Sequence, residues 1–148
     1  MFKGLSIASA GMSAQRARLH VISSNLANAS TTRTEDGGPY KRREAVFRTT
    51  LPEGWQEAMK GDEPGKASVG MSLRGVEVSD VQHDPIPGPL VFDPGHPDAD
   101  ENGNVEMPNV NPVEEMVDMI AASRSFEANA QSFQTLRDMV MRALDIGR

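Results

Sequence analysis

Residues 111–148 read NPVEEMVDMIAASRSFEANAQSFQTLRDMVMRALDIGR. The apolar residues of this stretch recur three or four positions apart, the spacing of one helix face. Asn111 can cap the first turn, and Pro112 suits the first helical position. Glu114 and Glu115 then lie near the positive end of the helix dipole. We expect a helix of about 35 residues, roughly 50 Å long. Its apolar positions are Val113, Met116, Ile120, Phe126, Ala130, Phe133, Leu136, Val140 and Leu144.

A second helix is predicted near the N-terminus, over residues 3 to 30. Its apolar residues alternate between spacings of three and four, which is the heptad rhythm of packed helices. This seam consists of Leu5, Ala8, Met12, Gln15, Leu19, Ile22, Leu26 and Ala29. Gln15 is the polar break in the seam. The helix should end within residues 28–32, where Asn, Ser and Thr side chains compete with the backbone for hydrogen bonds.

Residues between the helices predict short strands and loops. A turn is expected at Asp36–Pro39, followed by an alternating strand over Tyr40–Thr50. Residues 53–68 have a loop composition, and Val69–Val78 alternates again, with Gly75 as a candidate bulge or kink. Seven prolines between residues 84 and 112 exclude a helix there and leave room only for short edge strands such as Leu90–Phe92.

These elements predict a mainly α fold. The two long helices should pack as an antiparallel coiled-coil-like pair, with a small irregular β-containing insert between them. We expect three parts: an N-terminal helical part over residues 1–33, the small β-containing insert over residues 34–110 and a C-terminal helical part over residues 111–148. The insert is too small to cover both helices, and each apolar stripe needs a partner. Neighbouring copies of the chain are therefore expected to cover part of the stripes.

Charge is unevenly distributed along the chain. The net charge is −6, but residues 1–50 carry eight Lys or Arg and three acids, whereas residues 51–148 carry seven and eighteen. A solvated surface that varies by chance explains this, and so does attraction between unlike parts of neighbouring copies. The sequence alone does not separate these two interpretations.

Chemistry-bearing motifs are weak. There are no cysteines, so thiolate chemistry is excluded. Asp98–Glu106 resembles the start of a calcium-binding loop, but its twelfth position is Asn109 instead of a bidentate Glu. Lys41–Arg43 is too small a basic cluster for nucleic acid binding. We therefore expect no catalytic residue, cofactor, metal site or nucleic acid partner.

Membrane insertion is not expected either. No run of 18 or more apolar residues is present, and the N-terminus lacks the continuous apolar segment of a secretory signal peptide. Export by a route that reads no cleaved signal is compatible with this.

Three sequence blocks resemble the flagellar basal-body rod protein family. They are Ser23–Arg33 followed by Asp36–Tyr40, then Asp93–Pro112, then Glu115–Asn129. The Asp-Gly-Gly-Pro-Tyr form of the first block resembles the proximal rod members. The motif residues are Ser24, Asn25, Leu26, Ala27, Asn28, Thr31, Thr32, Gly37, Gly38, Pro39, Tyr40, Pro108, Asn109, Val110, Asn111, Glu115, Met116, Arg124, Glu127 and Asn129.

The resemblance implies a structural subunit without enzymatic activity, which polymerises through its terminal helices into the drive shaft that transmits torque. It implies export through the flagellar type III apparatus and a place in the rod crossing the periplasm. Its partners would be other copies and the neighbouring proximal rod, basal-body base and distal rod subunits. The competing interpretation is a soluble helical-hairpin module that captures one partner without forming a filament.

The residues expected to pack within or between subunits belong to both helical stripes. They are Leu5, Met12, Leu19, Ile22, Leu26, Met116, Ile120, Phe126, Ala130, Phe133, Leu136, Val140 and Leu144.

Overall fold

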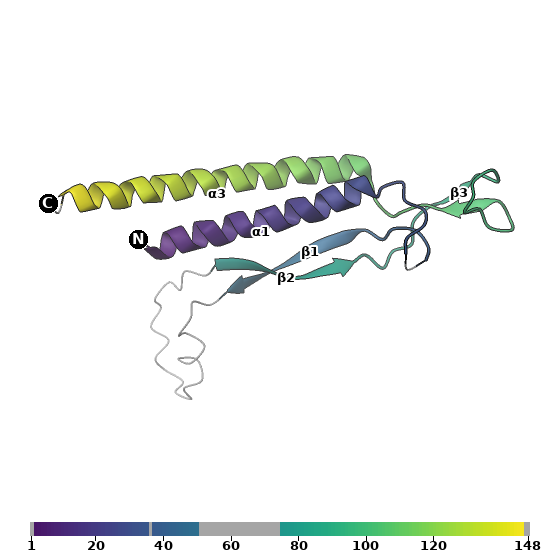
Figure 1. The fold of residues 1–148 in the computed structure, drawn as a ribbon, viewed down its shortest axis with the longest axis horizontal. Coiled ribbons are helices and arrows are strands. Elements are labelled where there is room, and N and C mark those ends of the chain that lie inside the picture. Colours follow the sequence, from purple (N-terminus) through teal and green to yellow (C-terminus); the bar gives the residue numbers. More distant parts are fainter. Residues whose placement is uncertain (1, 36, 51–74, 147–148) are drawn as a thin grey trace, which may run out of the picture.

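The chain forms an elongated molecule in which two long helices and a two-stranded sheet run side by side (Figure 1). A computed structural model describes residues 2–35, 37–50 and 75–146. The element order is α1 (Phe2–Ala27), β1 (Arg43–Thr50), β2 (Gly75–His83), β3 (Leu90–Phe92), β4 (Asn104–Glu106) and α3 (Pro112–Ile146). The predicted loop at residues 53–68 and the start of the second predicted strand, residues 69–74, lie outside the described residues.

Helix α1 ends close to the predicted place. The side-chain amide of Asn28 donates to the carbonyl of Ser24 at 2.8 Å, and the hydroxyl of Thr31 donates to Asn28 Oδ1 at 3.2 Å. These local bonds replace the next turn of helical hydrogen bonds. The polar residues therefore stop the helix, as expected.

Helix α3 begins as predicted. The backbone N–H of Val113 donates to Asn111 Oδ1 at 3.1 Å, so Asn111 is the N-cap, and Pro112 is the first helical residue. The helix has 35 residues, with Glu114 and Glu115 in its first turn.

The two helices lie side by side in opposite directions, and small residues allow their close approach (Figure 1). Ala8 and Ala14 of α1 and Ala122 of α3 are buried. A Cβ added to Gly11 would come within 3.0 Å of the Asn129 side chain. The tightest packing therefore uses glycine and alanine, and the larger apolar side chains flank it.

Strands β1 and β2 form an antiparallel hairpin that packs against α1, which lies between this sheet and α3 (Figure 1). Val46 pairs with Asp80 and Phe47 pairs with Val78, so Ser79 is an extra residue and forms a bulge. The expectation of a bulge at Gly75 is wrong, because Gly75 pairs regularly with Thr50.

Strands β3 and β4 form a second antiparallel pair beyond the end of the helices that is far from the two termini (Figure 1). Leu90 pairs with Glu106 and Phe92 with Asn104. Pro89 and Pro94 lie just outside β3, at positions where the backbone does not have to donate a hydrogen bond to β4. We call residues 84–106 the distal arm.

The expectation of a mainly α fold is wrong. Half of the structure is helical and about a fifth is in strands, arranged in two antiparallel sheets, so the fold is mixed α and β. The sequence pattern missed the second half of β2, Ser79–His83, where Val81 is the single apolar residue and no apolar alternation is visible, and it missed β4. The proline-rich stretch also forms a strand pair, since its prolines lie just outside the ladder.

Neither helix of the described residues is long and apolar enough to cross a membrane.

The close helix contact predicts a large effect of added volume at Ala122, which is fully buried. We expect Ala122→Leu to lower the free energy of unfolding by about 1–3 kcal/mol, because overpacking forces the helices apart. Ala121→Leu, at an exposed neighbouring position, is the matched control and should stay within about 0.5 kcal/mol of the parent. Urea unfolding followed by circular dichroism measures both, and equal losses would contradict the packing described.

Candidate functional site

A buried polar junction joins both helices to the segment between them, near the end of α1. Asn25 is 1% exposed and lies at its centre. Its side-chain amide donates to the carbonyl of Arg43 at 2.8 Å and to Glu115 Oε2 at 3.1 Å. Its oxygen accepts from the backbone N–H of Arg43 at 2.9 Å and from the Tyr40 hydroxyl at 3.0 Å. One side chain thus ties α1 to β1 and to α3.

Tyr40 places the loop before β1 against α1. It is buried, and its hydroxyl also lies 3.2 Å from the Ser24 hydroxyl. The Arg43 guanidinium lies over the Tyr40 ring, 5.6 Å from the centroid. Gly37 and Gly38, with φ of 82° and 78°, form the preceding turn in a conformation that glycine adopts without steric cost. The Gly-Gly-Pro-Tyr stretch therefore places the Tyr40 hydroxyl in the buried junction, next to Asn25.

Glu115 supplies the charge of the junction. It is 1% exposed, and its Oε1 accepts from Arg42 Nε at 2.6 Å. Burial lowers the pKa of Arg42, but its hydrogen bond to Glu115 and the charges of Glu115, Glu44 and Asp118 outweigh burial and hold the pKa above its usual value. Asp118 links this pair to α1 through Arg18, 3.4 Å away. Removing one partner would leave a buried charge without its counter-ion.

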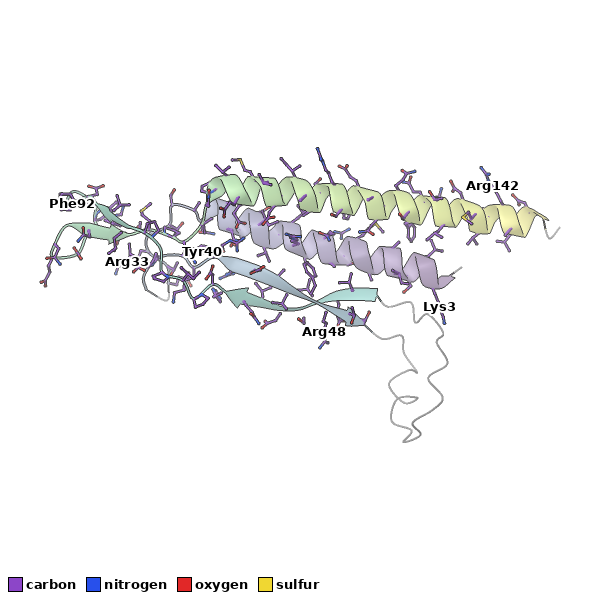
Figure 2. The ribbon with its side chains drawn as sticks, turned by 180° about the vertical axis from the view of Figure 1, so that it is seen from behind. Lys3, Arg33, Tyr40, Arg48, Phe92 and Arg142 are labelled. Atoms are coloured by element: carbon purple, nitrogen blue, oxygen red, sulfur yellow. The ribbon has the colours of Figure 1, made fainter. Side chains whose placement is uncertain are left out.

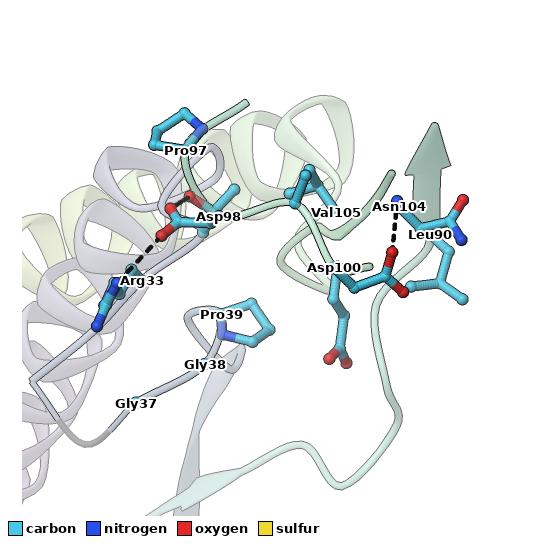
Figure 3. Close-up of a pocket in the computed structure, with 13 residues that line it drawn as sticks. Arg33, Gly37, Gly38, Pro39, Leu90, Pro97, Asp98, Asp100, Asn104 and Val105 are labelled. Atoms are coloured by element: carbon cyan, nitrogen blue, oxygen red, sulfur yellow. Dashed lines mark hydrogen bonds and ion pairs between the residues drawn. The ribbon is translucent and has the colours of Figure 1, made fainter. Parts of the chain in front are cut away.

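A second set of polar contacts attaches the distal arm (Figure 3). Asp98 accepts from the Thr32 hydroxyl at 2.8 Å and lies 3.5 Å from the Arg33 guanidinium. Hydrogen bonds from the backbone N–H groups of Asn104 and Asn102 lower the pKa of Asp100. An open groove of about 530 Å³ lies between the Gly37–Pro39 turn and the arm.

The predicted packing residues fall into two groups. Ile22 is buried, and nine others are half-buried: Leu5, Met12, Leu19, Leu26, Phe126, Ala130, Phe133, Leu136 and Val140. Met116, Ile120 and Leu144 are instead 47%, 56% and 65% exposed.

The family motif residues lie in the junction, at helix ends or on the exposed surface. Ser24, Asn25, Tyr40 and Glu115 meet in the junction, and Asn109 accepts the backbone N–H of Arg42 at 2.7 Å. Pro108 and Val110 are buried beside it. Asn28, Thr31 and Asn111 end or begin helices, and Asn129 packs against Gly11. Ala27, Arg124 and Glu127 are exposed and make none of these contacts.

Sequence reasoning missed three residues that the structure brings into these contacts. For the Lys41–Arg43 cluster the sequence allows a solvated strand end or a contact with an acidic neighbour, and it does not identify Glu115 as the partner of Arg42. Asp98 is considered in the calcium-loop-like stretch and in the second family block but not as a partner of Thr32, and Ala122 is absent from the predicted packing residues. Only for Ala122 was a signal available, since it lies seven residues after Glu115 on the same helix face.

The described residues contain no group of three or more His, Asp or Glu side chains placed to hold a metal ion. Asn25, Tyr40, Arg42 and Glu115 instead satisfy one another by hydrogen bonds, whereas the buried Asn109 Nδ2 has no hydrogen-bond partner among the described residues.

Comparison with known proteins gives matches at both ends and over nearly the whole chain. Residues 5–33 match the model for flagella basal body rod proteins, and residues 101–146 match the model for the C-terminal region of flagellar basal body rod FlgEFG proteins. The flagellar basal-body rod protein FlgC of Borreliella burgdorferi is 42% identical over 99% of this chain and 97% of its own. The FlgC protein of Bacillus subtilis is 38% identical over 99% of this chain and 98% of its own.

The chain belongs to the FlgC family of flagellar basal-body rod proteins. This confirms the predicted family and the predicted function as a structural subunit of the proximal rod. The alternative of a helical-hairpin module that captures a single partner is not favoured by these matches.

The junction predicts that Glu115 is far more important for stability than its neighbour Glu114. We expect Glu115→Ala to cost roughly 2–3 kcal/mol, because it removes charge-assisted hydrogen bonds from Arg42 and Asn25. Glu114→Ala removes an exposed acid from the same helical turn and should cost less than about 1 kcal/mol. Chemical unfolding of both variants measures the difference. A Glu115→Ala protein as stable as the Glu114→Ala protein would show that the junction does not stabilise the fold.

Proposed function

We propose that this FlgC-family subunit builds the proximal rod by packing the exposed apolar face of α3 against neighbouring subunits. The observation that carries the proposal is an unbroken apolar group on the first three turns of α3. Val113, Met116, Val117 and Ile120 are 64%, 47%, 61% and 56% exposed. We call these four residues the outer stripe.

The outer stripe lies on the side of α3 that faces away from α1. Glu115 and Ala122 point toward α1 and are buried, and the stripe residues lie on the opposite side of the helical wheel. A helix with apolar residues on two faces needs two partners. Because α1 covers one face, a neighbouring subunit is the natural cover for the other, where each buried apolar side chain contributes roughly 1.5–3 kcal/mol.

The polar junction suits a subunit that transmits torque. Asn25 and Glu115 link both helices and β1 through directional hydrogen bonds with specific geometry. Rotation of one helix relative to the other would break these bonds inside a buried site, which is costly. The subunit should therefore respond to load as one rigid body, and the drive shaft would derive stiffness from it.

The partners we propose are other copies of the chain and the neighbouring proximal rod, basal-body base and distal rod subunits. We also propose export through the flagellar type III apparatus and a location in the part of the rod that crosses the periplasm. The role is structural, without catalysis. The proposed partners, export route and location rest on membership of the FlgC family. The proposed structural role also rests on the hydrogen bonds by which the junction links both helices to β1.

The outer stripe predicts a loss of assembly without a loss of folding. We expect Ile120→Asp to abolish rod assembly and motility in a bacterium that carries only this variant, because a charge would be buried at a subunit contact without a partner. The isolated protein should keep its stability within about 1 kcal/mol, since Ile120 is exposed in the single subunit. Motility plates and electron microscopy of basal bodies measure assembly.

The matched control is Gln131→Asp, an exposed polar position further along α3. It should leave cells motile. Motile cells carrying Ile120→Asp would refute the proposed contact.

A further inference from the structure

The distal arm contains the only Asn-Gly pair of the sequence, Asn102–Gly103. The chain has seven asparagines, and the residue after each one decides how easily the next backbone nitrogen reaches the asparagine side chain. Pro112, after Asn111, has no N–H. The residues after five others carry a Cβ, which crowds the approach, and they are Leu26, Ala29, Val105, Val110 and Ala130. Gly103 combines an N–H with the absence of a Cβ.

The Asn102–Gly103 pair lies in the turn that leads into β4. Figure 2 shows Phe92, which pairs with the residue directly after Gly103, at the opposite end of the molecule from Lys3 and Arg142. Asn102 is exposed, and Gly103 is half-buried. Solvent water therefore reaches the side-chain amide of Asn102.

The reaction that this pair permits is deamidation through a cyclic succinimide. The Gly103 nitrogen forms a bond to Asn102 Cγ and the Cγ–Nδ2 bond breaks, so that ammonia leaves with the proton from Gly103. Water then opens the ring at Cγ, which gives aspartate, or at the backbone carbonyl carbon, which gives isoaspartate. No electrons are transferred, and water is the co-reactant. Asparagine is accordingly one of the thermolabile residues of proteins.

Hydrogen bonds of the turn oppose this reaction. The N–H of Gly103 donates to the carbonyl of Asp100 at 3.0 Å. The backbone N–H groups of Asn102 and Asn104 both donate to Asp100 Oδ1 at 2.8 Å, and Figure 3 shows the bond from Asn104. Asp100 thus holds the backbone on both sides of Gly103 and keeps its nitrogen bonded away from Asn102 Cγ. Attack requires the turn to open, and an exposed turn opens at a lower free-energy cost than the core.

We propose that Asn102 is a site of spontaneous deamidation and that Asp100 sets its rate by holding the turn closed. Asp100 is a positioning residue, because the reacting atoms belong to Asn102 and Gly103. The inference concerns the chemistry of a single chain and does not depend on the proposed subunit contacts.

Deamidation would change both the charge and the backbone of the distal arm. Residues 84–106 contain six Asp or Glu and no Lys or Arg, so a further carboxylate beside Asp100 and Glu101 adds to like charge. Isoaspartate also lengthens the backbone by a carbon atom directly before Gly103. This shifts the start of β4 relative to Phe92, its partner in the strand pair.

The site is tested by incubating the purified full chain at mildly alkaline pH, where the Gly103 nitrogen loses its proton more readily. Peptide mass spectrometry follows the conversion of each asparagine, and an isoaspartate assay identifies the second product. We expect Asn102 to convert several-fold faster than Asn104, which lies in the same turn but is followed by Val105. Conversion of Asn102 that is no faster than that of Asn104 would overturn the site.

Two variants of the turn test the role of Asp100. Asp100→Ala should raise the conversion rate of Asn102 several-fold, whereas Asp100→Asn, which keeps an oxygen acceptor, should restore most of the restraint. Glu101→Ala is the matched control, because it removes an exposed acid from the same turn and leaves Asp100 and its hydrogen bonds in place. Equal rates in Asp100→Ala and Glu101→Ala would show that Asp100 does not control the reaction.

Discussion

The carboxylate of Glu115 is buried where α1, α3 and the segment before β1 meet. A charged group that is 1% exposed must be paired and hydrogen-bonded, and Arg42 and Asn25 meet this need. Arg42 belongs to the segment before β1, Asn25 to α1 and Glu115 to α3. Satisfying one carboxylate therefore fixes how the helix pair meets the sheet. Tyr40 and Asn109 complete the arrangement by holding the chain on both sides of Arg42 and Asn25.

The junction and the helix packing together leave specific surfaces free. Gly11 and Ala122 bring the helices close, so that one face of α3 is covered by α1. The larger apolar residues Val113, Met116, Val117 and Ile120 then remain outside, as do Leu90 and Phe92 on the distal arm. The single subunit therefore leaves large apolar side chains of α3 and of the distal arm exposed to solvent. This is the expected character of a subunit whose core is completed by its neighbours.

Much of the fold was predictable because local chemistry determines it. Asn111 with Pro112 places the start of α3, and Asn28 with Thr31 ends α1. The sheets were only partly predictable, since Asp80–His83 pairs with β1 although Val81 is its single apolar residue and no apolar alternation reveals a strand. The junction was only partly predictable. The family motifs point to Asn25, Tyr40 and Glu115, but nothing local pairs Arg42 with a carboxylate 73 residues away. Periodicity also cannot separate apolar residues covered by the same chain, such as Phe126, from exposed ones such as Ile120.

In the rod, the outer stripe of α3 should become a subunit contact while the junction stays as it is in the single subunit. A cryo-electron microscopy map of intact basal bodies, at a resolution that shows side chains, tests this most directly. We expect Met116 and Ile120 to contact side chains of an adjacent subunit, with Glu115 still bonded to Arg42 and Asn25. A map in which Met116 and Ile120 face the central channel or open solvent would contradict it.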